Sequence, residues 1–183
     1  MSSGKPNVII PTLSFVLLLA GVGVAIFMSG SDEQEVPTGQ PAPAFSVPWL
    51  GASDQSAGPQ DYRGNVVILD FWATYCEPCR RTMPALQDIF DDYASQDLTL
   101  LSVNVDGPDV GREQLVSAFL RTFRLRFPVL MDNGSAARAY SVSGIPHIVL
   151  VDRAGRVRLS HVGVLEEDQL RAQLDDLLAE PRN

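Results

Sequence analysis

The sequence predicts an α/β domain with a central mixed β-sheet flanked by helices, preceded by one N-terminal transmembrane helix. The first observation is an apolar stretch without charged residues at 8–28. The second is the alternation, from residue 45 onward, of apolar runs typical of buried strands with segments of helical periodicity. The third is a candidate hairpin, His147–Val151 and Val157–Val164, which adds antiparallel pairing to the sheet.

The apolar stretch 8–28 would span roughly 30 Å as a helix, which matches the hydrocarbon core of a bilayer. Lys5 precedes this stretch and acidic residues follow it. Because basic residues favour the cytoplasmic side, we expect residues 1–7 in the cytoplasm and the rest of the chain outside it. A cleaved signal peptide is the alternative, but the stretch is longer than a typical signal-peptide core, so an uncleaved anchor is favoured.

The segment after the anchor is expected to lead into the domain through a flexible linker. Residues 29–44 are rich in Ser, Gly, Pro and acidic residues, which is typical of a linker, and the domain is expected to cover 45–183. Phe45–Leu50 could form a short strand, and Gly51–Gly64 is turn-rich. Val66–Phe71 is an apolar run with a single acid, which predicts a buried central strand.

Helical and strand patterns alternate through the remainder of the domain. After Cys76, apolar residues at helical spacing predict a helix that Pro84 would kink. The remaining expected elements are strands at Leu98–Val105 and Pro128–Met131, helices at Gln114–Phe123 and Ser135–Tyr140, the hairpin, and a last helix at Glu166–Leu178.

Charge and cysteine content narrow the function classes. The formal net charge is −8 and no cluster of Lys and Arg is present, so a nucleic-acid partner is not expected. The chain has two cysteines, Cys76 and Cys79. A structural disulfide between them would close too short a loop to constrain the unfolded chain much. Redox chemistry or metal binding remains for this pair.

The surroundings of Cys76 and Cys79 favour redox chemistry. A buried strand leads into a short loop, and a helix is expected to begin at Cys76, where free N–H groups and the helix dipole stabilise a thiolate. Pro78 suits the first turn because its missing N–H has no partner there. We therefore expect Cys76 to be the nucleophile, with a lowered pKa, and Cys79 to be the buried resolving thiol.

Two acids are candidates for assisting the cysteines. Asp70, on the buried strand, should have a raised pKa and could accept the proton of Cys79; alternatively, it is an acid that only finds hydrogen bonds at a strand end. Glu77, between the cysteines, would oppose thiolate formation and shift the potential of the pair. The alternative for Glu77 is a solvated acid that favours the helix dipole.

The segment Trp72-Ala-Thr-Tyr-Cys-Glu-Pro-Cys-Arg80 resembles the active site of thioredoxins. With the expected anchor and the Glu-Pro between the cysteines, the chain most resembles the TlpA/ResA/CcmG-like group of membrane-tethered thioredoxins. Gly144-Ile145-Pro146 matches the cis-proline loop of that family. Residues 107–132 would supply the extra helix and strand of the group. The resemblance implies a thioredoxin-like fold from Pro41 onward.

The resemblance also implies a substrate-binding surface and a cis peptide bond before Pro146. The backbone of Ile145 would pair with an extended client segment beside Cys76. Tyr75 stands where the family usually has Trp, and His147 stands where Thr is usual; His147 could sense pH, contact a partner or make ordinary hydrogen bonds. The substrate-binding residues implied by the resemblance are Trp72, Tyr75, Pro78, Ile145 and Pro146.

The function that these expectations favour is reduction of client disulfides in the periplasm or its equivalent. The resemblance implies electrons from an integral-membrane thiol carrier of the DsbD/CcdA kind. The implied clients are oxidised apocytochrome c or a copper-site assembly protein. No cofactor beyond the Cys76–Cys79 disulfide and no metal are expected. The alternatives are a disulfide-donating oxidase, a Cu(I) metallochaperone and, least favoured because Pro-x-x-x-Thr-x-x-Cys is absent before Cys76, a thiol peroxidase.

Overall fold

The computed structural model describes residues 36–182 of the chain. The predicted cytoplasmic segment 1–7, the predicted transmembrane helix 8–28 and the first part of the predicted linker lie outside the described residues. Within the described part, no helix is long and apolar enough to cross a membrane.

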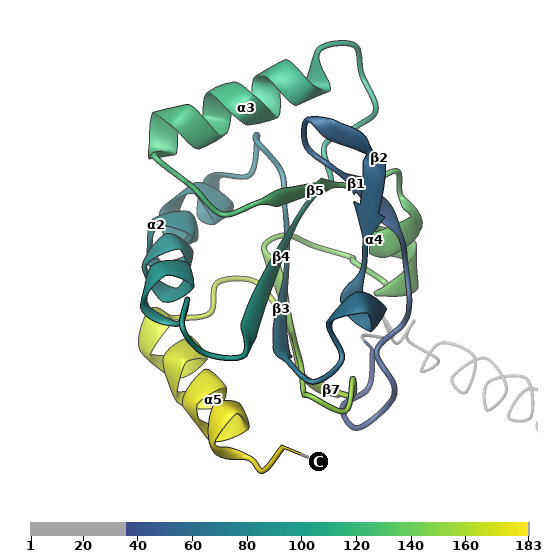
Figure 1. Ribbon diagram of the computed structural model, residues 1–183. Coiled ribbons are helices and arrows are strands. Elements are labelled where there is room, and N and C mark those ends of the chain that lie inside the picture. Colours follow the sequence, from purple (N-terminus) through teal and green to yellow (C-terminus); the bar gives the residue numbers. More distant parts are fainter. Residues whose placement is uncertain (1–35, 183) are drawn as a thin grey trace, which may run out of the picture. The chain divides into compact units, whose positions relative to one another are not determined.

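A mixed β-sheet forms the centre of the domain, as predicted (Figure 1). Its strands in the described part are β1 (Val47–Trp49), β2 (Ala52–Ala57), β3 (Val66–Trp72), β4 (Leu98–Asn104), β5 (Val129–Met131), β6 (His147–Val151) and β7 (Val157–Val162). They lie in the order β2-β1-β5-β4-β3-β6-β7. β3 and β4 are parallel, as are β4 and β5, whereas β6 is antiparallel to both β3 and β7.

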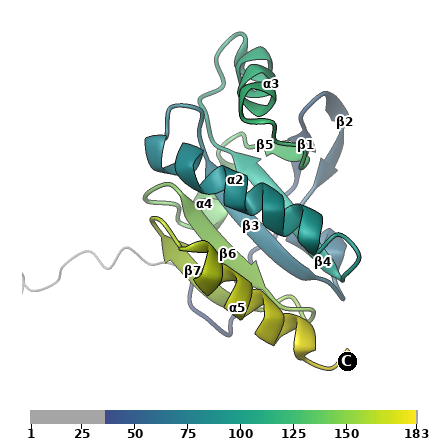
Figure 2. The same cartoon turned by 90° about the vertical axis from the view of Figure 1, so that its left-hand side faces the viewer.

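Helices cover both faces of this sheet. Within residues 36–182 they are α2 (Glu77–Asp92), α3 (Arg112–Phe123), α4 (Ser135–Ala139) and α5 (Glu167–Ala179), with a 3₁₀ turn, η1 (Pro59–Tyr62). α2 and α5 lie side by side over one face (Figure 2). The apolar side chains of α2, α3 and α5 share one core, and those of α4 belong to the core on the other face. The predicted helix-flanked architecture is therefore confirmed.

β3 joins the two cores because it is buried along its whole length. Side chains alternate between the faces of a strand, so Ile68 and Trp72 face the core that contains Cys79 and α5. Leu69 and Phe71 face the opposite core. Because β3 is held on both faces, it fixes the position and direction of the loop that leads from its end to the cysteines.

The segment Gly51–Gly64 differs from the expectation of turns alone. It contains β2 and η1. Four of the six residues of β2 are exposed, and the strand is polar and lies at an edge of the sheet, so it has no apolar alternation that would reveal it. β2 is held instead by its pairing with β1.

The ordered fold begins before Phe45. Gly39 N–H donates to the carbonyl of Val157 at 2.7 Å, and Ala42 N–H donates to the carbonyl of Gly155 at 2.9 Å. These residues belong to the stretch expected as linker, yet they extend the pairing beside β7. Proline and glycine content alone did not reveal this pairing, because it depends on a strand more than a hundred positions away.

Candidate redox site

Cys76 is the N-cap of α2, at the end of the short loop that follows β3. It forms a disulfide with Cys79, one turn into the helix. Cys79 N–H donates to Cys76 Sγ at 3.2 Å, so a free backbone donor of the helix N-terminus already faces this sulfur. Cys76 is 6% exposed and Cys79 is 1% exposed. Both cysteines are therefore buried, and Cys76, at the helix N-terminus, is the slightly more exposed of the two.

The first turn of α2 contains Glu77 and Pro78, as expected. Pro78 occupies a position whose N–H would have no partner within the helix. Glu77 points into solvent and pairs with Arg80 at 3.3 Å, one turn further along the helix. The side chain of Glu77 is 66% exposed, which matches the solvated first-turn acid considered above. Its charge nevertheless stands directly beside Cys76 in the chain.

Asp70 is buried in the middle of the protein, facing the core that contains Cys79. Its Oδ2 has no hydrogen-bond partner among the described residues, contrary to an acid that simply satisfies itself at a strand end. Burial raises the pKa of Asp70 to about 7. The side chain lines a pocket of about 190 Å³ between α2, β6 and the start of α5. Asp70 is therefore a group that can take up or release a proton near neutral pH.

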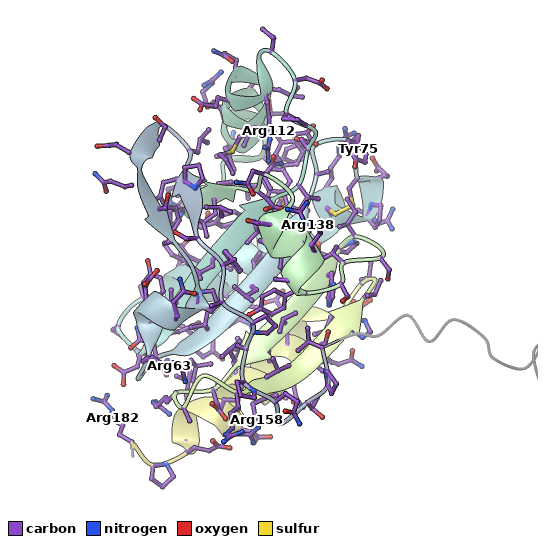
Figure 3. All side chains as sticks on the ribbon, turned by 90° about the vertical axis from the view of Figure 1, so that its right-hand side faces the viewer. Arg63, Tyr75, Arg112, Arg138, Arg158 and Arg182 are labelled. Carbon is purple, nitrogen blue, oxygen red and sulfur yellow. A yellow bond between two sulfur atoms is a disulfide. The ribbon has the colours of Figure 1, made fainter. Side chains whose placement is uncertain are left out.

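Two aromatic residues flank the loop and lie very differently. Trp72 is fully buried and its Nε1–H donates to Ser102 Oγ at 2.8 Å, so the indole is fixed in the core at the residue from which the loop starts. Tyr75 is 71% exposed and directly precedes Cys76. In Figure 3 it lies at the same end of the molecule as the disulfide. Of the two, Tyr75 is the one that an approaching protein would meet.

The peptide bond between Ile145 and Pro146 is cis, as predicted. His147, the next residue, begins β6 and pairs with Phe71 at the end of β3. The cis-proline loop and the cysteine loop therefore meet at the same end of the sheet. His147 is buried and its Nε2 lies 2.8 Å from Ser160 Oγ. The predicted role of the Ile145 backbone in client binding stays a prediction.

The sequence did not single out the side chains that hold the cysteine loop. Asp106 accepts the backbone N–H of Thr74 at 3.0 Å, and Arg80 donates to the carbonyl of the same residue. One signal was available for Asp106: it follows β4, which is parallel to β3, and the carboxyl ends of neighbouring parallel strands meet at one edge of a sheet.

A surface hollow lies beside the cysteine loop. Its volume is about 380 Å³, and Thr74, Tyr75, Asp106 and the segment from Gly107 to Leu115 contribute to its lining. Val110 is fully exposed and Leu115 is 54% exposed. Together with Tyr75 they are three of the four large exposed apolar side chains of residues 36–182. The hollow is thus lined by exposed apolar side chains, Tyr75, Val110 and Leu115, and by the carboxyl groups of Asp106 and Asp109, next to the redox pair. Within the same residues, no group of three or more His, Cys, Asp or Glu could hold a metal ion.

The chain is similar to known proteins over most of its length. A family model described as "AhpC/TSA family" matches residues 38–160. The Thioredoxin-like protein YneN of Bacillus subtilis is 32% identical over 87% of this chain and 92% of that protein. The Thiol-disulfide oxidoreductase ResA of Geobacillus thermodenitrificans is 31% identical over 94% of this chain and 97% of that protein. A crystal structure of a thiol:disulfide interchange protein DsbE from Chlorobium tepidum superposes with a TM-score of 0.69 at 32% identity, covering 78% of this chain and 99% of the other.

Proposed function

This chain belongs to the AhpC/TSA family and is a thiol–disulfide oxidoreductase of the ResA and DsbE type, and from that premise we propose that it reduces disulfides of specific client proteins outside the cytoplasm. The observation that carries the proposal is the Cys76–Cys79 disulfide at the N-terminus of α2, where Cys76 caps the helix and is slightly more exposed than Cys79. The expected anchor at residues 8–28 would hold the domain at the membrane surface, where tethering raises its local concentration near clients.

The reaction exchanges one disulfide for another. The Cys76 thiolate attacks a sulfur of the client disulfide, forms a mixed disulfide and releases the first client thiolate. Cys79 then loses its proton and attacks the Cys76 sulfur, which releases the second client thiolate and forms the Cys76–Cys79 disulfide. Two electrons pass from the protein to the client, whose two thiolates take protons from the solvent, so the client leaves as a dithiol. The protein ends in the oxidised state that the structure describes.

Asp70 supports this sequence of steps as the base that accepts the proton of Cys79. The inner thiol is almost completely buried, so water is a poor acceptor for its proton. Asp70 faces the same core and has a pKa near 7, which allows it to take the proton and later release it to the solvent. The pocket that it lines offers space for water between the carboxyl group and the surface.

The acidic surroundings of Cys76 and Cys79 support the proposed direction of electron flow, from this protein to its client. Asp70 lies on the buried strand that leads to the cysteine loop, and Glu77 lies between the two cysteines, so both place carboxyl groups near the pair. Negative charge disfavours a thiolate, and a dithiol with a poorly stabilised thiolate gives up its electrons readily. A low potential suits a protein that reduces its clients. A disulfide donor would require the opposite, a strongly stabilised thiolate.

The clients that we propose are oxidised apocytochrome c or a copper-site assembly protein. The exposed Tyr75, Val110 and Leu115 beside Cys76 provide an apolar contact surface that a client segment could cover. Because extracytoplasmic compartments are oxidising, the reductant needs its own electron supply. An integral-membrane thiol carrier is proposed as the donor, which would return the Cys76–Cys79 disulfide to the dithiol.

The redox state of the full-length chain in intact cells tests both the side of the membrane and the direction. A membrane-impermeant maleimide should label Cys76 without added reductant, since a reductase is kept in the dithiol state and Cys79 is buried. The double variant Cys76→Ser/Cys79→Ser is the control and should stay unlabelled. Labelling only after a reductant is added would identify a disulfide donor. Labelling only in broken cells would place the domain in the cytoplasm.

Trapping of the mixed disulfide tests the assigned roles of the two cysteines. In the variant Cys79→Ala, the second step is blocked, so a client should remain attached to Cys76 until dithiothreitol is added. Cys76→Ala keeps the inner thiol and is the matched control; it should trap at least tenfold less client. Equal trapping by both variants would contradict the assignment of Cys76 as the nucleophile.

A further inference from the structure

The backbone of Thr74 is held from two sides by charged side chains from different elements. Its N–H donates to Asp106, with distances of 3.0 Å to Oδ1 and 3.3 Å to Oδ2. Its carbonyl oxygen accepts two hydrogen bonds from Arg80, from Nε at 3.2 Å and from Nη2 at 2.7 Å. Thr74 stands two positions before Cys76, in the loop that joins β3 to α2. Hydrogen bonds to charged groups are about twice as strong as neutral ones, so these bonds hold the Thr74 peptide firmly. We call the pair Asp106 and Arg80, with their hydrogen bonds to Thr74, the clamp.

The clamp continues to the nucleophile through the backbone. Cys76 N–H donates to the carbonyl of Ala73 at 3.1 Å, and Arg80 N–H donates to the carbonyl of Cys76 at 3.2 Å. Ala73, which precedes Thr74, and Arg80, which donates to the carbonyl of Thr74, are therefore also hydrogen-bonded to Cys76. Fixing Thr74 fixes the direction in which the chain enters α2, and with it the place of the Cys76 sulfur at the helix N-terminus.

Asp106 is itself held by buried polar groups at the ends of β4 and β5. Asn104 Nδ2–H donates to Asp106 Oδ2 at 3.0 Å. The guanidinium of Arg112 donates to Asn104 Oδ1, with 3.1 Å from Nε, and to the carbonyl of Asp132, with 2.6 Å from Nη1. Arg112 begins α3, and in Figure 3 it lies at the same end of the molecule as Tyr75 and the disulfide. Two further residues thus connect the inserted helix to the loop of the nucleophile.

We propose that Asp106 and Arg80 are positioning residues of the redox site, which hold the Thr74 peptide from opposite sides and thereby keep the Cys76 sulfur at the N-terminus of α2. This inference rests on the proposed role of Cys76 as the nucleophile. Neither residue touches the reacting sulfurs; both act through Thr74. Their effect is to keep the helix donors on Cys76 Sγ, which stabilises its thiolate when the disulfide is reduced.

Because Asp106 and Arg80 carry opposite charges, the pKa of Cys76 in variants that lack one or the other can distinguish positioning from a direct effect of charge. Removing the carboxylate of Asp106 would by charge alone lower the pKa of Cys76. Removing the guanidinium of Arg80 would by charge alone raise it. If both residues act by positioning, removing either side chain lets the Cys76 sulfur move away from the helix N-terminus. The pKa of Cys76 then rises in both variants.

The test is the rate at which Cys76 of the reduced full-length protein reacts with iodoacetamide as a function of pH, for Asp106→Ala and Arg80→Ala. The chain contains no other cysteines than the redox pair, and Cys79 is buried, so the rate reports the thiolate of Cys76. We expect both variants to react at least threefold more slowly than the unaltered protein below its pKa. The double variant should fall short of the product of the single effects, because both act on one peptide.

Matched controls use neighbouring residues of the same charge. Arg81→Ala and Asp109→Ala remove a guanidinium and a carboxylate next to the clamp, and neither side chain has a hydrogen bond to the loop among the contacts of residues 36–182. We expect these two variants to change the rate less than twofold. Arg80→Lys retains the charge but not the two-donor fork, so it should still lower the rate, and it serves if Arg80→Ala fails to fold.

The outcome separates the proposal from its rivals. Slower alkylation in both clamp variants, with unchanged control variants, supports positioning. A faster rate in Asp106→Ala together with a slower rate in Arg80→Ala would overturn it in favour of charge alone. Unchanged rates in both would overturn it outright. Slower alkylation in both clamp variants, together with no trapping of a client by Cys79→Ala, would instead count against the proposed function and leave the clamp standing.

Discussion

Among residues 36–182, Asp70 forms no ion pair with a cationic side chain. The residue opposite it on β4 is Ser102, whose hydroxyl is engaged by the indole of Trp72. Desolvation therefore acts on this carboxyl group without an opposing charge, and its pKa rises from 3.8 to about 7. The protein keeps an acid where an apolar side chain would pack more favourably, which is typical of a residue kept for chemistry rather than for stability.

Replacing Asp70 should stabilise the oxidised protein in a pH-dependent way. The folded state holds a proton up to about pH 7, whereas the unfolded chain loses it near pH 4, so the free energy of unfolding falls as the pH rises between these values. Asp70→Asn removes this loss. We expect a gain on the order of 4 kcal/mol at pH 8 and little gain at pH 4. Urea unfolding at the two pH values measures it; an equal effect at both would contradict the raised pKa.

The same substitution should slow the chemistry. Without the carboxylate, Cys79 loses its proton to a poorer acceptor, and general-base catalysis is typically worth about a hundredfold or more. We expect release of the second client thiol from the mixed disulfide to slow by about that factor at pH 7 in Asp70→Asn. Rapid-quench analysis of a disulfide peptide measures this step. Asp88→Asn, on the exposed face of α2, is the control, and an equal rate in both variants would argue against the base.

At the scale of elements, the strongest patterns in the sequence were reliable. β3, β4 and β6 are apolar runs buried on both faces, and α5 shows helical spacing of apolar residues, so each was predicted close to its observed bounds. α2 was expected to follow Cys76 and begins at Glu77. β2 was missed because its sequence is polar and its stability comes from β1. β7 ends at Val162, earlier than expected, because Gly163 adopts a φ of 102° that a strand does not allow.

Arg112 links the start of α3 to the ends of β4 and β5 through hydrogen bonds. The guanidinium bonds Asn104 and the carbonyl of Asp132, and these acceptors would lose their partner in Arg112→Ala. Leaving buried polar groups unsatisfied costs about 1–3 kcal/mol, so we expect the free energy of unfolding to drop by that amount. Arg121→Ala, exposed on the same helix, should change it by less than about 0.5 kcal/mol. Similar losses in both variants would show that Arg112 contributes only helix propensity.

At the scale of the whole molecule, the redox site is assembled from three separated segments. The loop after β3, the end of β4 and the start of β6 meet at one end of the sheet because β3 lies between the other two strands. The sequence predicted Cys76, Cys79 and Asp70 from local pattern and the cis bond before Pro146 from resemblance. The contact of Asp106 with Thr74 was not predicted, because it depends on the parallel pairing of β3 and β4 and not on a local pattern around either residue.

The two redox states should differ in stability. Acidic surroundings disfavour a Cys76 thiolate, so reduction should destabilise the folded protein relative to the disulfide form. We expect a lower melting temperature for the reduced full-length protein than for the oxidised one. Differential scanning calorimetry in the presence and absence of dithiothreitol compares them, with the Cys76→Ser/Cys79→Ser variant as the control that should not respond. A reduced form that melts higher would point to a disulfide donor.

The reduction potential of the Cys76–Cys79 pair tests the central claim most directly. The full-length protein is equilibrated with glutathione buffers of defined ratio, its free thiols are alkylated, and the reduced fraction is counted by mass. The acidic surroundings and the proposed reductase function predict a potential near or below about −230 mV, toward the thioredoxin end of the range. A potential near about −120 mV, as in strong disulfide donors, would contradict the account and reverse the direction of electron flow.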